Sequence, residues 1–334
     1  VERLAGGATL RLGQPVAREV ILQSEKPWEG TALLISSVYE HNGVQHLLYR
    51  GINEATGSED ASSVYLCLVT SKDGIHWERP ELGLVDFQGS KANNITATAD
   101  GKAQTFMFTF YDPRPGIPDD ERVKGIDMRD GERRAGGAGK GLRAQILGSA
   151  DGRVWRDLGV GADLQSDWPN AFDGGSVFWS DTEQQFVGYF RWWDTEAPRH
   201  ARTLDDWMII RPGVRSVFRS VSKDLKSWSK PEPMSFGDTP REHIYDPKLY
   251  LSLAARFNPG RRALSLEEER ALAIRTFPGN KNTPTYTFAS DANDMVLLTT
   301  KPGALAYDRP FMEAFLRPGP EAGHWTSRTN CTAL

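Results

Sequence analysis

A short phrase recurs along the chain and constrains its fold more than any other feature. Three copies share the spacing Ser-x-Asp-x-x-x-Trp, at residues 71–77, 149–155 and 222–228. Their tryptophans are 78 and 73 residues apart, and a degenerate fourth copy beginning at Thr300 leads to Tyr307, 79 residues further on. One motif per unit at a nearly fixed period is typical of repeat architectures. Units of this length suit the blades of a large β-propeller better than a solenoid.

Each copy of the phrase predicts a tight turn between two strands. In the first two copies Asp is followed by Gly, a pair that favours hairpins because Gly adopts positive φ and Asp hydrogen-bonds to the turn backbone. An apolar run, Val64–Val69, precedes the first copy, and the closing Trp is expected to pack against neighbouring strands. Three unrelated hairpins in an all-β domain are the alternative, but the shared spacing favours a repeat.

Composition excludes several classes of function. The net charge of −4 argues against a nucleic-acid-binding protein. The longest apolar runs are far shorter than the roughly 18 residues of a membrane span. Two cysteines, Cys67 and Cys331, make neither a disulfide framework nor a zinc pattern. The chain opens at Val1 without an initiator Met or a signal-like region, so we expect a trimmed or partial sequence, and the compartment and oligomeric state stay open.

The repeat predicts one all-β domain over 1–334, a five-bladed β-propeller whose last blade is incomplete. The expected blades are 28–92, 93–171, 172–241, 242–310 and the partial 311–334. The expected strands are 31–39, 46–50, 63–70, 105–111, 142–149, 176–179, 186–192, 216–221, 248–255 and 295–300. A capping box at Ser265–Glu268 predicts a short helix, Glu267–Arg275, inserted in the fourth blade.

Four carboxylates lie near the openings of successive units, where innermost blade strands line a central funnel. They are Glu29, Asp112, Asp173 and Glu242. Glycoside hydrolysis needs such a set, because one carboxylic acid protonates the leaving oxygen while a carboxylate attacks the anomeric carbon or activates water. A further carboxylate can raise the pKa of the acid through like-charge proximity. Each could instead cap a turn or form a strand-end ion pair; Asp112 and Asp173 are favoured because they adjoin aromatic strand runs.

Polar and aromatic companions fit a sugar-binding site. The candidates for substrate binding are Trp28, Arg191, Trp193, His243 and Tyr245. Arg can bind hydroxyls or a carboxylate bidentately, and Trp can stack on a sugar face. Core packing for the tryptophans, a blade-to-blade ion pair for Arg191 and strand capping for the other two are the alternatives. No metal-ligand cluster is evident, although a structural cation in the channel is compatible with such propellers.

Several phrases resemble those of a known group of proteins. They are Trp28-Glu-Gly30, Thr70–Trp77 followed by Leu82-Gly83, and Asn93-Asn-Ile95. With these phrases the chain resembles bacterial proteins often labelled as relatives of glycoside hydrolase family 32. Those proteins belong with the five-bladed propeller glycosidases of families 32, 43, 62 and 68. The resemblance covers most of the chain at the level of the blade rhythm.

The resemblance implies a nucleophile or base on the first blade, a stabilising Asp on the second and a general acid on the third. Carried over by blade, these positions fall on Glu29, Asp112 and Asp173. The sequence Tyr111-Asp-Pro113 is similar to the family's Arg-Asp-Pro. By contrast, Asp173 stands where the family has Glu, and the family's Asn-Asp-Pro-Asn-Gly phrase is absent around Glu29.

The expected function is hydrolysis of a glycosidic bond in a plant, algal or microbial glycan, with an oligosaccharide or polysaccharide as substrate and no cofactor. The first alternative is a non-catalytic carbohydrate-binding propeller, motivated by the missing family phrase. A sialidase-like enzyme ranks lower, because the Asp-box of sialidases has one more residue between Asp and Gly. A protein-interaction propeller would show a wide apolar face in place of a carboxylate-lined funnel.

Overall fold

In the part of the chain that the structure describes, all regular structure apart from two short turns of 3-10 helix is β-strand. The computed structural model describes residues 11–13, 15–16, 18–30, 32–52, 64–105, 108–130, 142–163, 171–194, 214–236, 249–258, 276–277, 286–287 and 292–317. The 3-10 turns are η1 (Pro27–Glu29) and η4 (Asp119–Glu121). The expected all-β class is therefore confirmed for the described part, and the expected helix at 267–275 lies outside it. Within the described part, no helix is long and apolar enough to span a bilayer.

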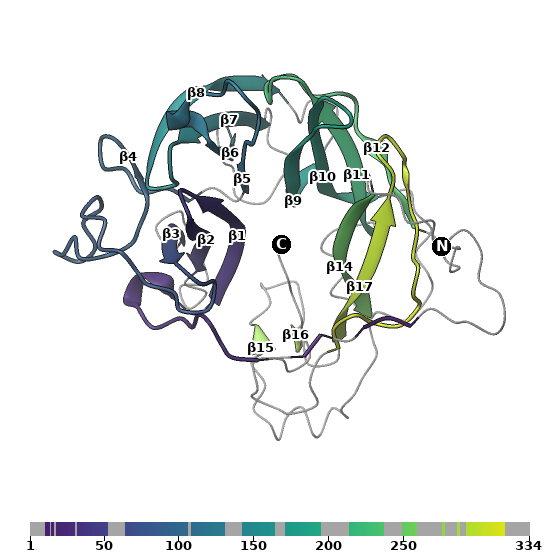
Figure 1. Cartoon of the computed structure of the whole chain (residues 1–334), viewed down its shortest axis with the longest axis horizontal. Helices are drawn as coiled ribbons and strands as arrows, with labels where there is room; N and C mark the ends of the chain where they lie inside the picture. The colour runs from purple at the N-terminus through teal and green to yellow at the C-terminus, as the bar shows by residue number, and fades with distance from the viewer. Residues whose placement is uncertain are drawn as a thin grey trace. The chain divides into compact units, whose positions relative to one another are not determined.

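The larger of two compact units, Arg18–Trp192 with Val217–Glu232, contains three sheets that follow one another along the chain (Figure 1). The first is β1 (Ala32–His41), β2 (Val44–Ile52) and β3 (Val64–Ser71). The second is β5 (Phe108–Tyr111), β6 (Val123–Asp130), β7 (Leu142–Ser149) and β8 (Val154–Asp163), with β4 (Ala97–Thr98) parallel to β8. The third is β9 (Ala171–Ser180), β10 (Gln185–Asp194), β11 (Val214–Ser222) and β12 (Glu232–Pro233). Apart from β4, sequential neighbours pair in order in each of these sheets.

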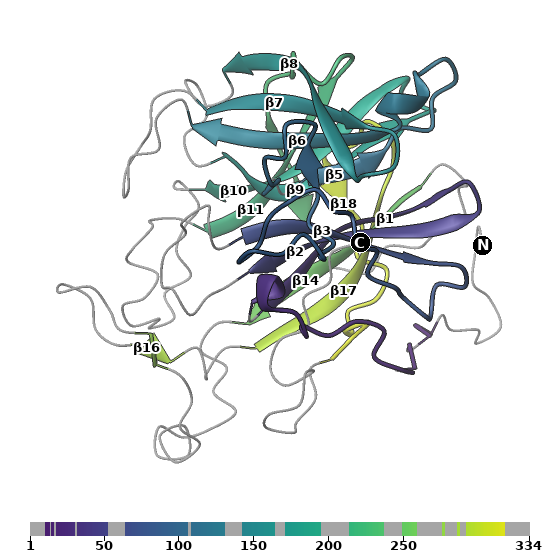
Figure 2. The ribbon, with the colours of Figure 1, turned by 90° about the vertical axis from the view of Figure 1, so that its left-hand side faces the viewer.

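The smaller unit contains a long two-stranded sheet. It joins β14 (Tyr250–Asn258) to β17 (Ala292–Thr300) in antiparallel register (Figure 2). Two short pairs accompany it: β13 (Ser235–Phe236) with β18 (Ala306–Tyr307), and β15 (Thr276–Phe277) with β16 (Tyr286–Thr287). The backbones of Phe315 and Leu316 hydrogen-bond to Met295 of β17. Phe315 and Leu316, which were expected to belong to a fifth blade, therefore pair with β17.

In the larger unit, the first strands of the three sheets are neighbours, and β1 and β5 run parallel. The Oγ atoms of Ser36 and Ser37 lie 2.9 and 2.5 Å from Oγ1 of Thr109. Further along both strands, the ring of Tyr39 stacks on that of Tyr111, with centroids 5.9 Å apart. Because both contacts advance in the same direction along the two strands, the amino ends of β1 and β5 lie at the same side.

The same argument shows that β5 and β9 are parallel. Phe108 lies against Phe190, which pairs with Gly175 of β9. Phe110 lies against Phe186, which pairs with Trp179. Advancing along β5 therefore means advancing along β9. The amino ends of β1, β5 and β9 lie at one side of the three sheets and their carboxyl ends at the other, and Figure 1 shows the three strands on the inner side of the arc that these sheets make.

The first and second sheets bury both faces, since adjacent residues of one strand enter different cores. Leu147 of β7 joins a core between the first and second sheets, whereas its neighbour Ile146 joins a core between the second and third. In β3, Leu66 and Leu68 enter the first of these cores, while Cys67 enters a third core on the far face of that sheet. Burying a Leu or Ile side chain contributes about 1.5–3 kcal/mol, so these layers hold the sheets together.

The recurring phrase forms the predicted turn in each copy, after β3, β7 and β11. In the first copy, Oγ of Ser71 accepts the backbone N–H of Gly74 at 2.9 Å. Oδ1 of Asp73 accepts the backbone N–H groups of Ile75 and His76. The indole N–H of Trp77 donates to the carbonyl of Gly74 at 3.0 Å and closes the loop. These bonds satisfy the turn backbone, so the phrase encodes local structure.

All four copies place positive φ at the same position of the phrase. Gly74, Gly152 and Gly303 have φ of 77°, 84° and 75°. In the third copy the residue is Leu225, with φ of 65°. The fourth copy, degenerate in sequence, therefore keeps the backbone conformation of the others at this position.

Two strands of the second sheet were not expected from the sequence. They are β6 and β8, whose alternation is interrupted by charged residues and glycines. On β6, Lys124 is only 4% exposed, and its Nζ lies 2.8 Å from Oε2 of Glu121. A paired lysine thus occupies an interior position that the apolar pattern would leave out.

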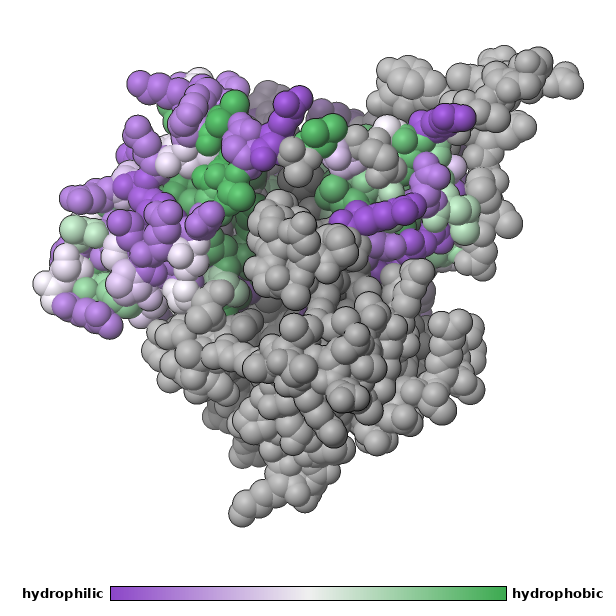
Figure 3. Space-filling view, turned by 90° about the horizontal axis from the view of Figure 1, so that it is seen from below, coloured by the Kyte–Doolittle hydropathy of each residue, from purple (hydrophilic) through white to green (hydrophobic). Residues whose placement is uncertain are grey.

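Figure 3 shows hydrophilic side chains (purple) projecting from the outer parts of the described surface, with apolar ones (green) further in.

Candidate functional site

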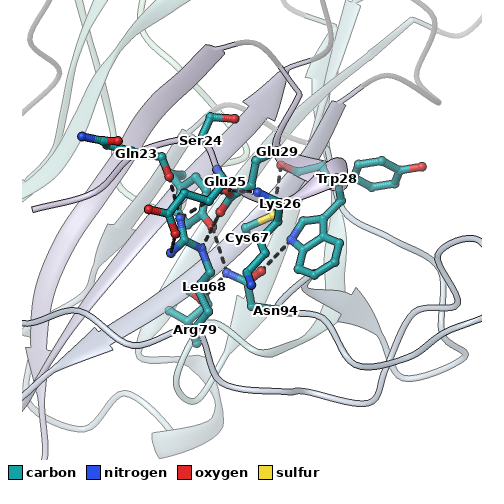
Figure 4. A network of polar contacts seen from close by, with 12 residues as sticks. Gln23, Ser24, Glu25, Lys26, Trp28, Glu29, Cys67, Leu68, Arg79 and Asn94 are labelled. Carbon is teal, nitrogen blue, oxygen red and sulfur yellow. Dashed lines mark hydrogen bonds and ion pairs between the residues drawn. The ribbon is translucent and has the colours of Figure 1, made fainter. Parts of the chain in front are cut away.

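The carboxylate of Glu29 lies at the amino end of β1 and is fully buried. Arg79 donates to it from both Nε, at 2.7 Å from Oε1, and Nη2, at 3.2 Å from Oε2. Tyr49 donates its hydroxyl at 2.5 Å, and the backbone N–H groups of Glu25 and Lys26 donate at 2.8 and 3.0 Å. Figure 4 shows Arg79, Glu25 and Lys26 gathered around Glu29. With this full set of donors, Glu29 is held as an anion.

The pKa of Glu29 follows from these contacts. Burial alone would raise it, but the hydrogen bonds from Arg79, Tyr49 and the two backbone N–H groups outweigh burial and bring the pKa below its usual value. A general acid needs the opposite shift, toward neutrality. The geometry of Glu29 therefore suits a structural ion pair, and the catalytic role predicted for it stays a prediction without support from these contacts.

Asn94 extends this network to Trp28. The Asn94 amide is fully buried; its Oδ1 accepts the indole N–H of Trp28 at 2.7 Å, and its Nδ2 donates to the hydroxyl of Tyr49 at 2.9 Å. The Trp28 ring packs edge-on against Phe87 with centroids 5.8 Å apart. The far face of the first sheet is thus covered by the chain's own segments around 22–28 and 84–87. Packing accounts for the contacts of Trp28 that the structure records.

Asp112 directly follows β5 and is fully buried in a bidentate ion pair. Arg114 donates from Nε to Oδ1 at 2.9 Å and from Nη2 to Oδ2 at 2.7 Å. The guanidinium of Arg114 lies over the rings of Trp179 and Phe186, 4.6 and 4.4 Å from their centroids. Asp112 thereby orients a cation that joins the second sheet to the third through cation–π contacts.

The structure does not bring Asp112 and Asp173 together. Asp112 is at the carboxyl end of β5, beside Trp179 through Arg114, whereas Asp173 is near the amino end of β9. From position 173 to position 179 the strand spans about 15–20 Å. The two carboxylates of a glycosidase stand roughly 5–9.5 Å apart. Because β5 and β9 are parallel, the backbone places these two residues toward opposite ends of the sheets.

Asp173 and Arg191, by contrast, occupy opposed backbone positions in the third sheet. Phe190 of β10 pairs with Gly175 of β9, and the next pair is Trp192 with Ala171. Residues 172–174 therefore oppose Arg191 alone and form a bulge on β9. Bulges of this kind bend a strand, re-aim side chains and are frequent beside active sites. The bulge lies at the amino end of β9, the side at which Glu29 also precedes β1.

The remaining predicted residues fall where the structure gives less. Trp193 lies on β10, next to the strand end, and only its backbone is described. Glu242, His243 and Tyr245 lie outside the described residues. Among the described residues, no group of three or more His, Cys, Asp and Glu side chains is arranged to hold a metal ion.

The sequence analysis did not predict the two arginines that form ion pairs with Glu29 and Asp112. Arg79 is fifty residues from Glu29, and nothing in the sequence links them. Arg114 is only two residues from Asp112, and this spacing at a strand end could have indicated a local ion pair.

Comparison with known proteins gives weak likenesses only. No family model matches the chain, and no curated protein matches it. An N-acetylgalactosamine deacetylase from F. plautii, in complex with blood group B trisaccharide, is 13% identical with a TM-score of 0.44, over 86% of this chain and 71% of that one. A glycosyl hydrolase from Bacteroides ovatus is 14% identical (TM-score 0.41; 85% and 71% covered). A fructofuranosidase from Schwanniomyces occidentalis, complexed with fructose, is 11% identical (TM-score 0.40; 82% and 46% covered). TM-scores below 0.5 assign neither family nor activity to this chain.

Proposed function

We propose that the chain is a glycoside hydrolase built on a five-bladed β-propeller. The propeller is supported by successive antiparallel sheets with apolar cores between them, by first strands that run parallel, and by the turn that recurs in all four copies of the phrase. The resemblance of the sequence to propeller glycosidases supports the reaction class.

The observation that carries the proposal is the bulge that places Asp173 opposite Arg191. Position 173 of the bulge lies near the amino end of an inner strand, and on this side of the sheets we propose the site. Asp173 would serve as one of the two carboxylates, acting as acid or as base, and Arg191 would bind sugar hydroxyls or a substrate carboxylate. Glu242 lies outside the described residues and stays a prediction from the sequence alone. This chemistry moves protons between carboxylates, water and the glycosidic oxygen, and it requires no cofactor.

A non-catalytic carbohydrate-binding propeller is the second candidate. Two of the four predicted carboxylates, Glu29 and Asp112, are fully buried and bidentately paired with arginine. Their pairing leaves a smaller set of acidic groups for catalysis. Under this alternative, Arg191 and the aromatic side chains would hold a glycan without cleaving it.

A hydrolysis screen with matched variants distinguishes the two. Purified protein is incubated with aryl furanosides, aryl pyranosides and a panel of glycans, and released sugar is measured. We expect turnover by the wild type, loss of at least 100-fold in Asp173→Asn, and wild-type turnover in Glu81→Gln, which changes an exposed carboxylate. Asp112→Asn should lose stability while keeping the kcat of its folded fraction.

The outcomes separate cleanly. Wild-type turnover that survives in Asp173→Asn would refute the assignment of the site. Saturable glycan binding without turnover, by a protein with intact circular dichroism, would favour the binding propeller. A kcat of Asp112→Asn as low as that of Asp173→Asn would contradict the placement of Asp112 outside the catalytic site.

A further inference from the structure

Gly175 occupies a backbone position that a side chain cannot share. Its φ is 152°, and a Cβ built there would lie 2.1 Å from the carbonyl oxygen of Tyr189 and 2.9 Å from Cα of Phe190. Both are backbone atoms of β10, so no change of rotamer relieves the clash. At this point β9 and β10 approach more closely than any residue other than Gly permits.

This close approach directly adjoins the bulge. Position 175 is the last regular pair before the ladder changes register, and the three residues 172–174 follow opposite Arg191. Three residues opposite one cannot all pair, so the backbone of 172–174 must bend away from regular pairing with β10. The conformation of the adjoining paired residue, Gly175, sets the direction of this bend. Gly175 and the next residue, Ser176, are both exposed, so the strand beside the bulge is open to solvent.

The geometry points to Gly175 as the positioning residue for Asp173: by letting β9 close onto β10, it fixes where the bulge begins and hence how residue 173 is presented to the site. This inference rests on the proposed function, in which Asp173 is one of the reacting carboxylates. Gly175 itself touches no substrate in this scheme. Its effect passes through the backbone, and a displacement of about 1 Å at a reacting group can cost on the order of 100-fold in rate.

The test compares Gly175→Ala with Gly188→Ala. Gly188 is also confined, since a Cβ there would lie 2.2 Å from the ring of Phe190, but it pairs regularly with Val177 outside the bulge. Both substitutions strain the same sheet, but a Cβ at position 188 meets side-chain atoms, whereas a Cβ at position 175 meets the backbone of β10 beside the bulge. On the aryl glycoside that the wild type hydrolyses fastest, we expect kcat of folded Gly175→Ala to fall by about 100-fold, with a shifted pH profile and a smaller change in KM. Folded Gly188→Ala should keep the wild-type kcat and pH profile.

Each outcome decides the inference. Wild-type kcat and pH profile in Gly175→Ala would overturn it. Should that variant fail to fold, deletion of Gly174 shortens the bulge by one residue while keeping Gly175; the same loss is expected, and wild-type activity would overturn the inference. If the wild type hydrolyses no glycoside, the proposed function fails, and ¹³C NMR titration of the Asp173 carboxyl group decides. A titration altered by Gly175→Ala but not by Gly188→Ala supports the positioning role, and an unaltered one overturns it.

Discussion

Leu225 holds a backbone conformation that glycine holds in the other copies of the turn, and replacing it measures the cost directly. Its φ is 65°, and its side chain is 2% exposed in the core between the second and third sheets. The left-handed conformation costs a non-Gly residue about 1–2 kcal/mol. Burial of a Leu side chain contributes about 1.5–3 kcal/mol. Burial is the larger effect, which explains why Leu is tolerated in this turn.

The strain at position 225 can be measured by comparing the stability penalty of Gly relative to Ala at two positions. Leu225→Ala should lower the free energy of unfolding by about 2–5 kcal/mol, because it opens a cavity and keeps the strained φ. Leu225→Gly opens the same cavity, and the removal of strain offsets the usual disadvantage of Gly relative to Ala. Leu68, fully buried in the extended strand β3, is the matched control. The penalty of Gly relative to Ala should be about 1–2 kcal/mol smaller at 225 than at 68.

The assay is urea denaturation followed by circular dichroism, with free energies of unfolding extrapolated to water for all four variants. Equal Gly-versus-Ala penalties at the two positions, within about 0.5 kcal/mol, would refute the argument that the turn imposes strain on Leu225. The same result would mean that the third copy of the phrase does not share the backbone conformation of the others.

Two further predictions concern buried polar groups. Arg79→Met leaves the carboxylate of Glu29 buried without its cation and should cost about 3–5 kcal/mol in urea denaturation, whereas the double variant Glu29→Gln/Arg79→Met should cost clearly less; equal losses would refute the ion-pair argument. His46 is 4% exposed and stacks on Tyr39, and burial lowers its pKa, so folding favours its neutral form. The unfolded state then binds more protons, and stability should fall as pH drops through about 6.5 toward the folded pKa; His46→Phe should flatten this part of the profile, and an unchanged slope would contradict it.

The sequence allowed the recurring turn to be predicted because its information is local. Ser, Asp and the closing Trp lie within seven residues, and their hydrogen bonds stay inside the phrase. The strand expected at 142–149 coincides with β7, and the one at 63–70 lies within one residue of β3. Short-range turn chemistry and uninterrupted apolar alternation act over a few residues, and both can be recognised before any fold is known.

The parts of the prediction that needed spatial information were harder to obtain. The strand β6 carries Lys124, which breaks the apolar pattern and becomes acceptable in the interior only through Glu121. The candidate carboxylates were chosen by blade order, and blade order does not say at which end of a strand a residue lies. Blade order groups Asp112 with Asp173, but Asp112 follows the end of β5 and Asp173 lies near the start of the parallel strand β9.

The bulge at 172–174 illustrates a different limit. The sequence Asp173-Gly-Gly175 marks a place where backbone freedom is needed, but it does not reveal the partner strand that requires it. Only the pairing of Phe190 with Gly175 and of Trp192 with Ala171 shows the three-against-one register. The long-range register therefore sets position 173 opposite Arg191, and residue spacing alone does not predict this.

The alternation of Ile146 and Leu147 between two cores has a consequence for how such a chain can evolve. A single-residue insertion within β7 would exchange the occupants of the two interfaces, and a core shaped for one set of side chains would receive the other. Selection should therefore remove length changes inside these strands while tolerating them in the connections. The strands then behave as fixed-length modules, and family members should differ in size mainly through their loops.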